Sequence, residues 1–105
     1  MSDLAQDHLG IDELIKDKRE AIIQLATQYG ASNVRVFGSV ARGEANESSD
    51  IDLLIDQDWS RLSGWGGMAL VVALEELLGR KVDVATIEEL KPHIQKQVLK
   101  EAVAL

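Results

Sequence analysis

Three short apolar runs rich in β-branched residues constrain the fold of this chain most. Each is bounded by glycine or polar residues, so we expect strands over residues 33–37, 51–55 and 81–85. Apolar residues at helical spacing around them predict helices over about 11–29, 68–78 and 92–103. Gly30 and Gly79 are expected to end two helices, Pro92 to begin the last, and Ser39 to cap a helical turn over 39–43. This alternation predicts an α/β fold with a small sheet packed against helices.

The length of the chain sets its expected organisation. At 105 residues with 46% hydrophobic content, it suits a single domain over 1–105, with residues 1–10 frayed. The longest apolar run, Met68 to Leu74, is too short to span a membrane, and no apolar run near the N-terminus indicates a signal peptide. With no cysteine there is no disulfide framework. We therefore expect a soluble, cytoplasmic protein without membrane contact.

The net charge of the chain limits the classes of partner that it is expected to bind. A formal net charge of -7 argues against direct nucleic-acid binding, because a phosphate backbone attracts clustered Lys and Arg. A basic protein partner would suit this charge better, in a homo- or hetero-oligomer.

Two carboxylates mark the start of the second expected strand. Asp50 and Asp52 are two positions apart, so their side chains project the same way. Such a pair commonly binds a divalent cation or shares a proton, and hard oxygen ligands of this kind favour magnesium. An isolated Asp-x-Asp is more often a polar turn before a strand, with Asp52 facing solvent. Here, however, Asp52 lies in an apolar strand that should be largely buried, and therefore needs a partner.

Gly38 and Ser39 follow the first expected strand and open a helical turn. A glycine lets the backbone approach a ligand, and free N–H groups at a helix start can meet phosphate oxygens. Alone, this pair would be an ordinary turn with a serine cap. Together with the downstream carboxylates, it predicts a nucleoside triphosphate site.

Asp83 supplies a third carboxylate, between two valines of the third expected strand. We expect it to be partly buried, to bind the catalytic magnesium and to help deprotonate an attacking hydroxyl. The alternative for Asp83 is an ion pair with Lys81 on the same face of the strand.

The pattern formed by Gly38-Ser39, Asp50-Ile51-Asp52 and Asp83 resembles the DNA polymerase β superfamily. More narrowly, residues 38–44, 49–54, 78–83 and 101–103 resemble the minimal nucleotidyltransferases that act as antitoxins beside HEPN-domain ribonuclease toxins. The likeness covers about residues 34–105. It implies the polymerase β-like nucleotidyltransferase fold, with a small mixed sheet.

The resemblance also implies an activity: transfer of a nucleoside monophosphate, AMP from ATP, to a tyrosine hydroxyl of a HEPN-type toxin. Asp50 and Asp52 would bridge two magnesium ions, Asp83 would serve the attacking side, and Gly38 and Ser39 would orient the terminal phosphates. One alternative is a non-catalytic antitoxin that neutralises its partner by binding. Another is a transferase acting on small molecules or tRNA ends, which the absence of an acceptor-binding domain argues against.

Some residues remain open from the sequence. Arg42 is equally suited to contact phosphate or to pair with Glu44. Trp59 and Trp65 lie in an expected loop over 56–67, where they would cap the base, anchor an interface or cover the core edge. Tyr29 suits packing or a partner contact. His8 and His93 lack a second ligand at metal-binding spacing and should be exposed.

Overall fold

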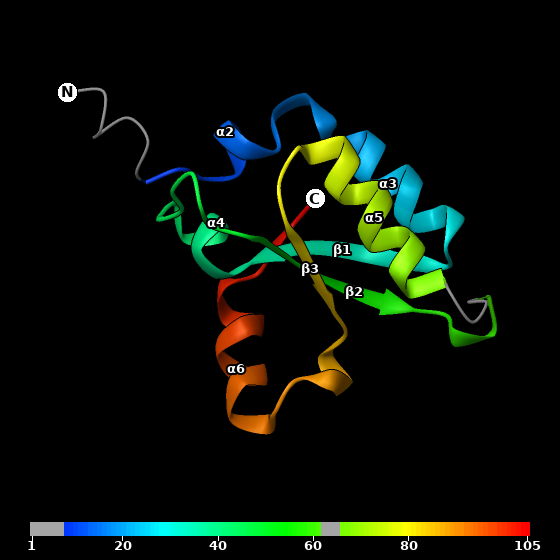
Figure 1. Ribbon diagram of the computed structural model, residues 1–105. Coiled ribbons are helices and arrows are strands. Elements are labelled where there is room, and N and C mark those ends of the chain that lie inside the picture. The colour runs from blue at the N-terminus through cyan, green and yellow to red at the C-terminus, as the bar shows by residue number, and fades with distance from the viewer. Residues whose placement is uncertain (1–7, 62–65) are drawn as a thin grey trace.

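The computed structural model describes residues 8–61 and 66–105 as a mixed sheet with helices around it (Figure 1). The helices are α2 (Ile11–Leu14), α3 (Arg19–Gln28), α4 (Gly38–Arg42), α5 (Gly66–Leu78) and α6 (Pro92–Glu101). The strands are β1 (Ala31–Phe37), β2 (Ile51–Gln57), β3 (Val82–Ala85) and β4 (Val103–Ala104). Three 3₁₀ turns are η1 (Lys16–Lys18), η2 (Trp59–Arg61) and η3 (Ile87–Glu89).

The four strands form one sheet in the order β3-β2-β1-β4. β2 runs parallel to β3, and β1 is antiparallel to both β2 and β4. α3 and α5 lie side by side along one face of this sheet (Figure 1). The expected α/β architecture with a small mixed sheet is confirmed.

The hydrophobic core lies between the sheet and the helices α3 and α5. Alternate residues of β2 point to opposite faces, and Ile51, Leu53 and Ile55 join this core. Asp52 and Leu54 therefore face the other side, where Leu54 is fully buried and η3 packs against β2. β2 is thus covered on both faces, which explains its nearly continuous apolar run.

The expected helix over 11–29 is broken in the structure. α2 ends at Leu14, and the 3₁₀ turn η1 separates it from α3. Within this break, Ile15 is fully buried and the Lys18 ammonium donates to the carbonyl oxygen of Leu77 at 2.8 Å. The change of direction lets Lys18 bind the end of α5 while Ile15 stays in the core.

The N-terminal segment and the segment after β2 were both expected to lack regular structure. Residues 1–7 of the segment that we expect to be frayed, 1–10, lie outside the described residues, while Leu9 exchanges two backbone hydrogen bonds with Ala45, at 2.8 and 3.0 Å. The expected loop over 56–67 is shorter, because β2 continues to Gln57 and η2 follows. Trp59 of η2 is 59% exposed, so it does not cover the core, and Trp65 lies outside the described residues.

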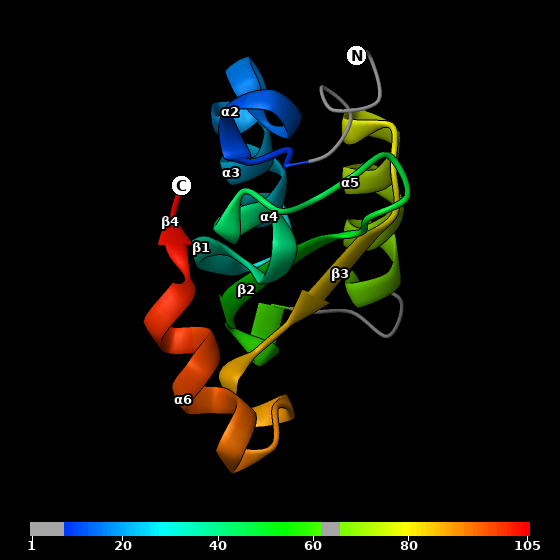
Figure 2. The same ribbon diagram turned by 90° about the vertical axis from the view of Figure 1, so that its left-hand side faces the viewer.

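The last helix is shorter than the apolar pattern predicted. Ala102 adopts an extended conformation, with φ of −63° and ψ of 136°, and ends α6. Val103 then pairs with Val36 as part of β4 (Figure 2). The open edge of β1 supplies backbone partners that a solvent-exposed helix end lacks, so the chain leaves the helix there.

No helix in the described ranges, 8–61 and 66–105, combines the length and apolar character that crossing a bilayer requires.

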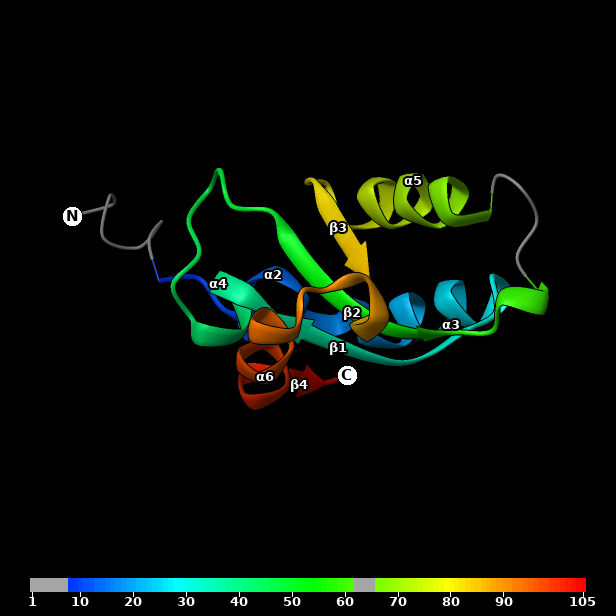
Figure 3. The same ribbon diagram turned by 90° about the horizontal axis from the view of Figure 1, so that it is seen from below.

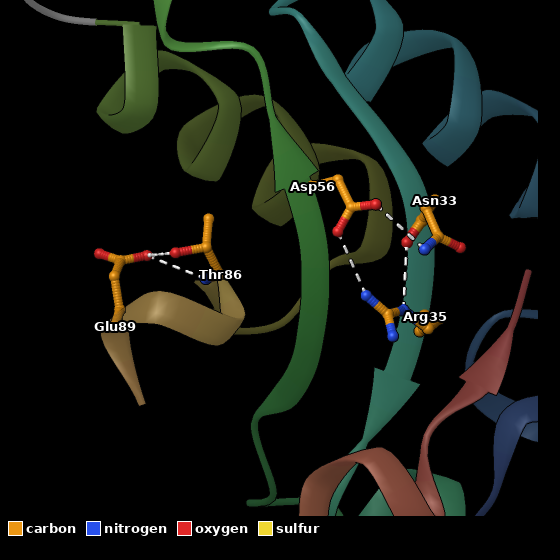
Figure 4. Close-up of polar contacts among 5 residues, drawn as sticks. All are labelled: Asn33, Arg35, Asp56, Thr86 and Glu89. Carbon is orange, nitrogen blue, oxygen red and sulfur yellow. Dashed lines mark hydrogen bonds and ion pairs between the residues drawn. The ribbon is translucent and has the colours of Figure 1, made fainter. Parts of the chain in front are cut away.

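A capped turn holds the end of β3. The backbone N–H and the hydroxyl of buried Thr86 both donate to Oε1 of Glu89, at 2.9 and 3.0 Å (Figure 4). This capping box starts η3, which covers the sheet beside Leu54. The cap therefore holds η3 in place at the end of β3, the strand that carries Asp83.

Replacing Glu89 with alanine should lower the free energy of unfolding by about 1 kcal/mol, because the buried Thr86 hydroxyl loses its acceptor. Urea unfolding measures this loss. Glu88→Ala is the matched control, since Glu88 is an exposed carboxylate on the same 3₁₀ turn. Equal loss in both variants would contradict a role for the cap.

Candidate active site

The centre of the candidate site is a pair of aspartates on neighbouring parallel strands. Asp52 of β2 lies directly opposite Asp83 of β3 in the register of the sheet. On its other side Asp52 lies opposite Phe37, the last residue of β1. Both carboxylates therefore leave the sheet on the face away from α3 and α5, at the level where β1 turns into α4.

Asp52 is half-buried and its carboxyl is electrostatically strained. Burial, followed by the negative charges of Asp83 and Asp50, raises the pKa of Asp52 from its ordinary value of 3.8 to about 6. Arg42 lowers it by less than these effects combined. Unpaired carboxylates in such an arrangement favour a proton or a cation at this position.

Asp83 is less enclosed than the sequence predicts, and Asp50 is exposed as well. The predicted partial burial of Asp83 is wrong, because Asp83 is exposed on β3, the strand at one end of the sheet. The alternative ion pair with Lys81 does not form within the described part of the chain. Asp50 is also exposed and lies just before β2. Among residues 8–61 and 66–105, no three acidic, histidine or cysteine side chains converge closely enough to enclose a metal ion.

The turn after β1 brings the backbone against Asp52. Gly38 has a φ of +74°, and a Cβ at this position would overlap Oδ2 of Asp52. Only glycine provides this conformation together with this close approach. Ser39 is the second residue of α4, and its side chain makes no capping bond, so the expected serine cap is wrong. The next two amides of α4, those of Ser39 and Val40, have no acceptor within the helix because they belong to its first turn.

Arg42 pairs with two carboxylates rather than one. Its Nε donates to Glu44 at 2.8 Å and its Nη1 donates to Glu101 at 2.9 Å. These hydrogen bonds, with Glu44 first and Glu101 second, raise the pKa of Arg42. The pair with Glu44 is therefore present, and the guanidinium side chain remains 42% exposed.

Glu101 is a site residue that we did not predict. Its Oε2 accepts a hydrogen bond from the backbone N–H of Gly38 at 2.6 Å, while Oε1 binds Arg42. The last turn of α6 thus meets α4, as the view in Figure 3 shows. Local sequence patterns give no signal for this contact, since Gly38 and Glu101 are 63 residues apart.

Arg80 is a second unpredicted residue, and it holds the loop before β2. Its Nη1 donates to the carbonyl oxygens of Asn46 and Ser49, at 3.0 and 2.9 Å. Ser49 immediately precedes Asp50, so this bond fixes the approach of the chain to the acidic pair.

A polar network continues along the same sheet face, away from Asp52. Asn33 and Arg35 of β1 both donate to Asp56 of β2, at 3.1 and 3.4 Å (Figure 4). Asp56 lies four residues after Asp52 but is neutralised by this pairing. The acidic charges that act on Asp52 are therefore chiefly those of Asp83 and Asp50.

The structure also shows the surroundings of the histidines and of Tyr29. His8 and His93 are exposed, as expected. Tyr29 is half-buried and packs against the core, which agrees with the packing role.

The chain matches the nucleotidyltransferase domain family over residues 15–105. A relative from Methanocaldococcus jannaschii, assigned as a protein adenylyltransferase, is 36% identical over 85% of this chain and 95% of its own length. The protein adenylyltransferase MntA of Thermococcus cleftensis is 41% identical over 76% of this chain and 80% of its own length.

Solved structures agree in fold. A structure described as a minimal nucleotidyltransferase is 44% identical and has a TM-score of 0.79, with 93% of this chain and 98% of that chain covered. A toxin–antitoxin complex with AMP-PNP has a TM-score of 0.66 at 22% identity, over 82% of this chain and 70% of that chain, and supports the fold alone. This chain therefore belongs to the nucleotidyltransferase domain family and is a nucleotidyltransferase.

Proposed function

We propose that this protein is a magnesium-dependent adenylyltransferase that acts as an antitoxin, by transferring AMP from ATP to a tyrosine hydroxyl of a HEPN-type toxin. The observation that carries the proposal is the register pairing of Asp52 with Asp83 beside the Gly38 turn. Two carboxylates and a set of backbone amides then meet where a triphosphate and an acceptor would come together. The name protein adenylyltransferase, which relatives of this chain carry, supports a protein as the acceptor.

The acidic residues suit magnesium by chemistry and by charge. Hard carboxylate oxygens are the ligands this ion prefers. Burial first, and then the negative charges of Asp83 and Asp50, raise the pKa of Asp52, and a bound cation would offset both effects. Asp50 and Asp52 would hold the ion or ions, with Asp83 on the acceptor side. The metal would neutralise the triphosphate and the charge that develops during transfer.

The amides at the start of α4 and the Ser39 hydroxyl would orient the terminal phosphates, and Arg42 would contribute positive charge beside them. The acceptor oxygen would then form a bond to the α-phosphorus, and the bond to the bridging oxygen would break, releasing pyrophosphate. Asp83 would take the acceptor proton, and its exposure supports this role because an incoming hydroxyl can reach it.

The decisive experiment incubates the protein with magnesium, ATP labelled at the α-phosphate and a HEPN-type protein bearing a surface tyrosine. We expect label on that tyrosine, dependent on magnesium and absent with the corresponding phenylalanine acceptor. Asp56→Asn is the matched control, since Asp56 lies on the same strand and face but is paired with Arg35. This variant should retain transfer.

If none of the nucleotides gives label transfer while the complex stays intact, the catalytic proposal is overturned. Neutralisation of the toxin's ribonuclease activity by Asp52→Ala, measured separately, would then identify a purely binding antitoxin.

A further inference from the structure

Glu101 joins the C-terminal helix to the turn that we assign to the phosphates. One carboxylate oxygen accepts from the Gly38 amide at 2.6 Å, and the other accepts from Arg42 at 2.9 Å. Gly38 begins α4 and Arg42 ends it, so a single side chain binds both ends of this short helix. The Glu101 side chain is only 16% exposed, which strengthens both charge-assisted bonds.

The backbone on both sides of Glu101 is itself held in place. Before it, α6 is anchored by buried Val98, whose carbonyl oxygen accepts from the Ala102 amide at 2.9 Å. After it, Val103 pairs with Val36 of β1, only two residues from Gly38. The carboxylate is therefore presented from a fixed base rather than from a free chain end.

The position of α4 decides how the phosphate donors stand relative to Asp52. At Gly38 there is no room for even one methyl group between the backbone and Oδ2 of Asp52. A shift of α4 toward the strand would be blocked, while a shift away would separate the donors from the carboxylates. Productive nucleotidyl transfer requires these groups to be held to a fraction of an ångström.

We infer that Glu101 is a positioning residue for nucleotidyl transfer, which holds the Gly38–Ser39 turn and Arg42 at a fixed distance from Asp52. This inference rests on the proposed function of the same site. It leaves the amides of Ser39 and Val40 as the donors for phosphate, because they belong to the first turn of α4 and have no acceptor within the helix.

A contrasting role would make Glu101 a temporary anion on the Gly38 amide that the triphosphate displaces. The two roles predict opposite effects of removing the carboxylate. A positioning residue strengthens nucleotide binding and turnover, whereas a displaced anion competes with the nucleotide and weakens its binding.

The test compares Glu101→Ala with Glu44→Ala, the matched control. Glu44 also pairs with Arg42, but it makes no contact with Gly38 among the bonds of the described residues. In folded Glu101→Ala we expect the Kd of ATP with magnesium to rise about tenfold and kcat to fall about tenfold, because the donors lose their position. Glu44→Ala, which removes an exposed ion pair, should stay within about twofold of the wild type.

Two further measurements separate positioning from simple folding support. Glu101→Gln keeps an acceptor for the Gly38 amide and should recover most of the lost kcat; it also decides the question if Glu101→Ala does not fold. The Gly38 amide proton, followed by NMR, should lie downfield in the wild type, stay there when ATP and magnesium are added, and move upfield in Glu101→Ala.

Tighter ATP binding by Glu101→Ala, or loss of the downfield amide signal on adding ATP, would establish displacement and overturn the inference. Unchanged Kd and kcat in folded Glu101→Ala would overturn it too. If the wild type binds ATP but transfers nothing, the proposed function fails, while the Kd and amide comparisons still decide the role of Glu101. If the wild type does not bind ATP at all, both fail.

Discussion

Asp52→Asn should abolish nucleotidyl transfer and, in the same molecule, raise the free energy of unfolding at neutral pH. The loss of activity should be on the order of 10³-fold, as for removal of a group that stabilises transition-state charge. The gain in stability follows from the environment of the carboxyl, where burial and the charges of Asp83 and Asp50 raise its pKa to about 6. Asparagine keeps the shape of the side chain without the charge.

The sign of the stability change follows from the direction of the pKa shift. The folded state binds the Asp52 proton more tightly than the unfolded state, whose pKa is near 3.8. The resulting stabilisation is fully present below that value and is lost as the pH rises through about 6. A pKa difference of one corresponds to about 1.4 kcal/mol. Because Asp52 is only half-buried, solvent screening reduces the total, and we expect asparagine to add about 1 kcal/mol to the free energy of unfolding at neutral pH.

Urea unfolding of both proteins in EDTA, at about pH 7 and about pH 4, measures this effect. The difference should be present at the higher pH and nearly absent at the lower. Asp58→Asn is a control of opposite sign, because hydrogen bonds from Ser60 lower the pKa of Asp58 and favour its charged form. If the Asp52→Asn variant is less stable than the wild type at neutral pH, the charged Asp52 carboxylate does not destabilise the folded state, which contradicts the raised pKa.

Gly38→Ala is the substitution expected to damage both the fold of α4 and the activity most. The residue has a φ of +74°, which costs an L-residue about 1–2 kcal/mol. In addition, the new methyl group would overlap Oδ2 of Asp52, so the aspartate or the turn must move. We expect a loss of at least about 2 kcal/mol in the free energy of unfolding and about 100-fold in kcat/KM.

Gly43→Ala separates the two causes. Gly43 caps the C-terminal end of α4 with a φ of +70°, but a Cβ at this position would meet no atom within 4 Å. It therefore measures the conformational cost without the overlap, and kcat/KM should remain near that of the wild type. Comparable losses of activity in the two variants would show that backbone strain, rather than the approach to Asp52, governs position 38.

Residue patterns predicted the centre of the candidate site because they rest on local signals. The spacing of Asp50 and Asp52 and the Gly38-Ser39 turn depend on strand alternation and on the conformation of one glycine. The exposure of Asp83 was predicted wrongly, although it lies between two valines as expected. Its strand lies at one end of the sheet order, and neither strand order nor sheet edges can be inferred from alternation along a single strand.

The C-terminal segment shows the limit of helical periodicity. Apolar residues continue at helical spacing past Glu101, so the pattern predicted helix through Val103. The structure instead ends α6 at Glu101, because the edge of β1 offers backbone hydrogen bonds to Val103. This turn out of the helix also fixes the base from which Glu101 reaches Gly38.

By itself, the sequence determined the three longer strands, the shared direction of Asp50 and Asp52 and the glycine turn, since these depend on neighbours within a few residues. Only the tertiary structure decided that Asp52 faces Asp83 across parallel strands. It alone revealed the contacts of Glu101 with Gly38 and of Arg80 with the loop before β2. Such contacts depend on how strands order and helices pack, and those arrangements are set by burial summed over the whole chain rather than by any local pattern.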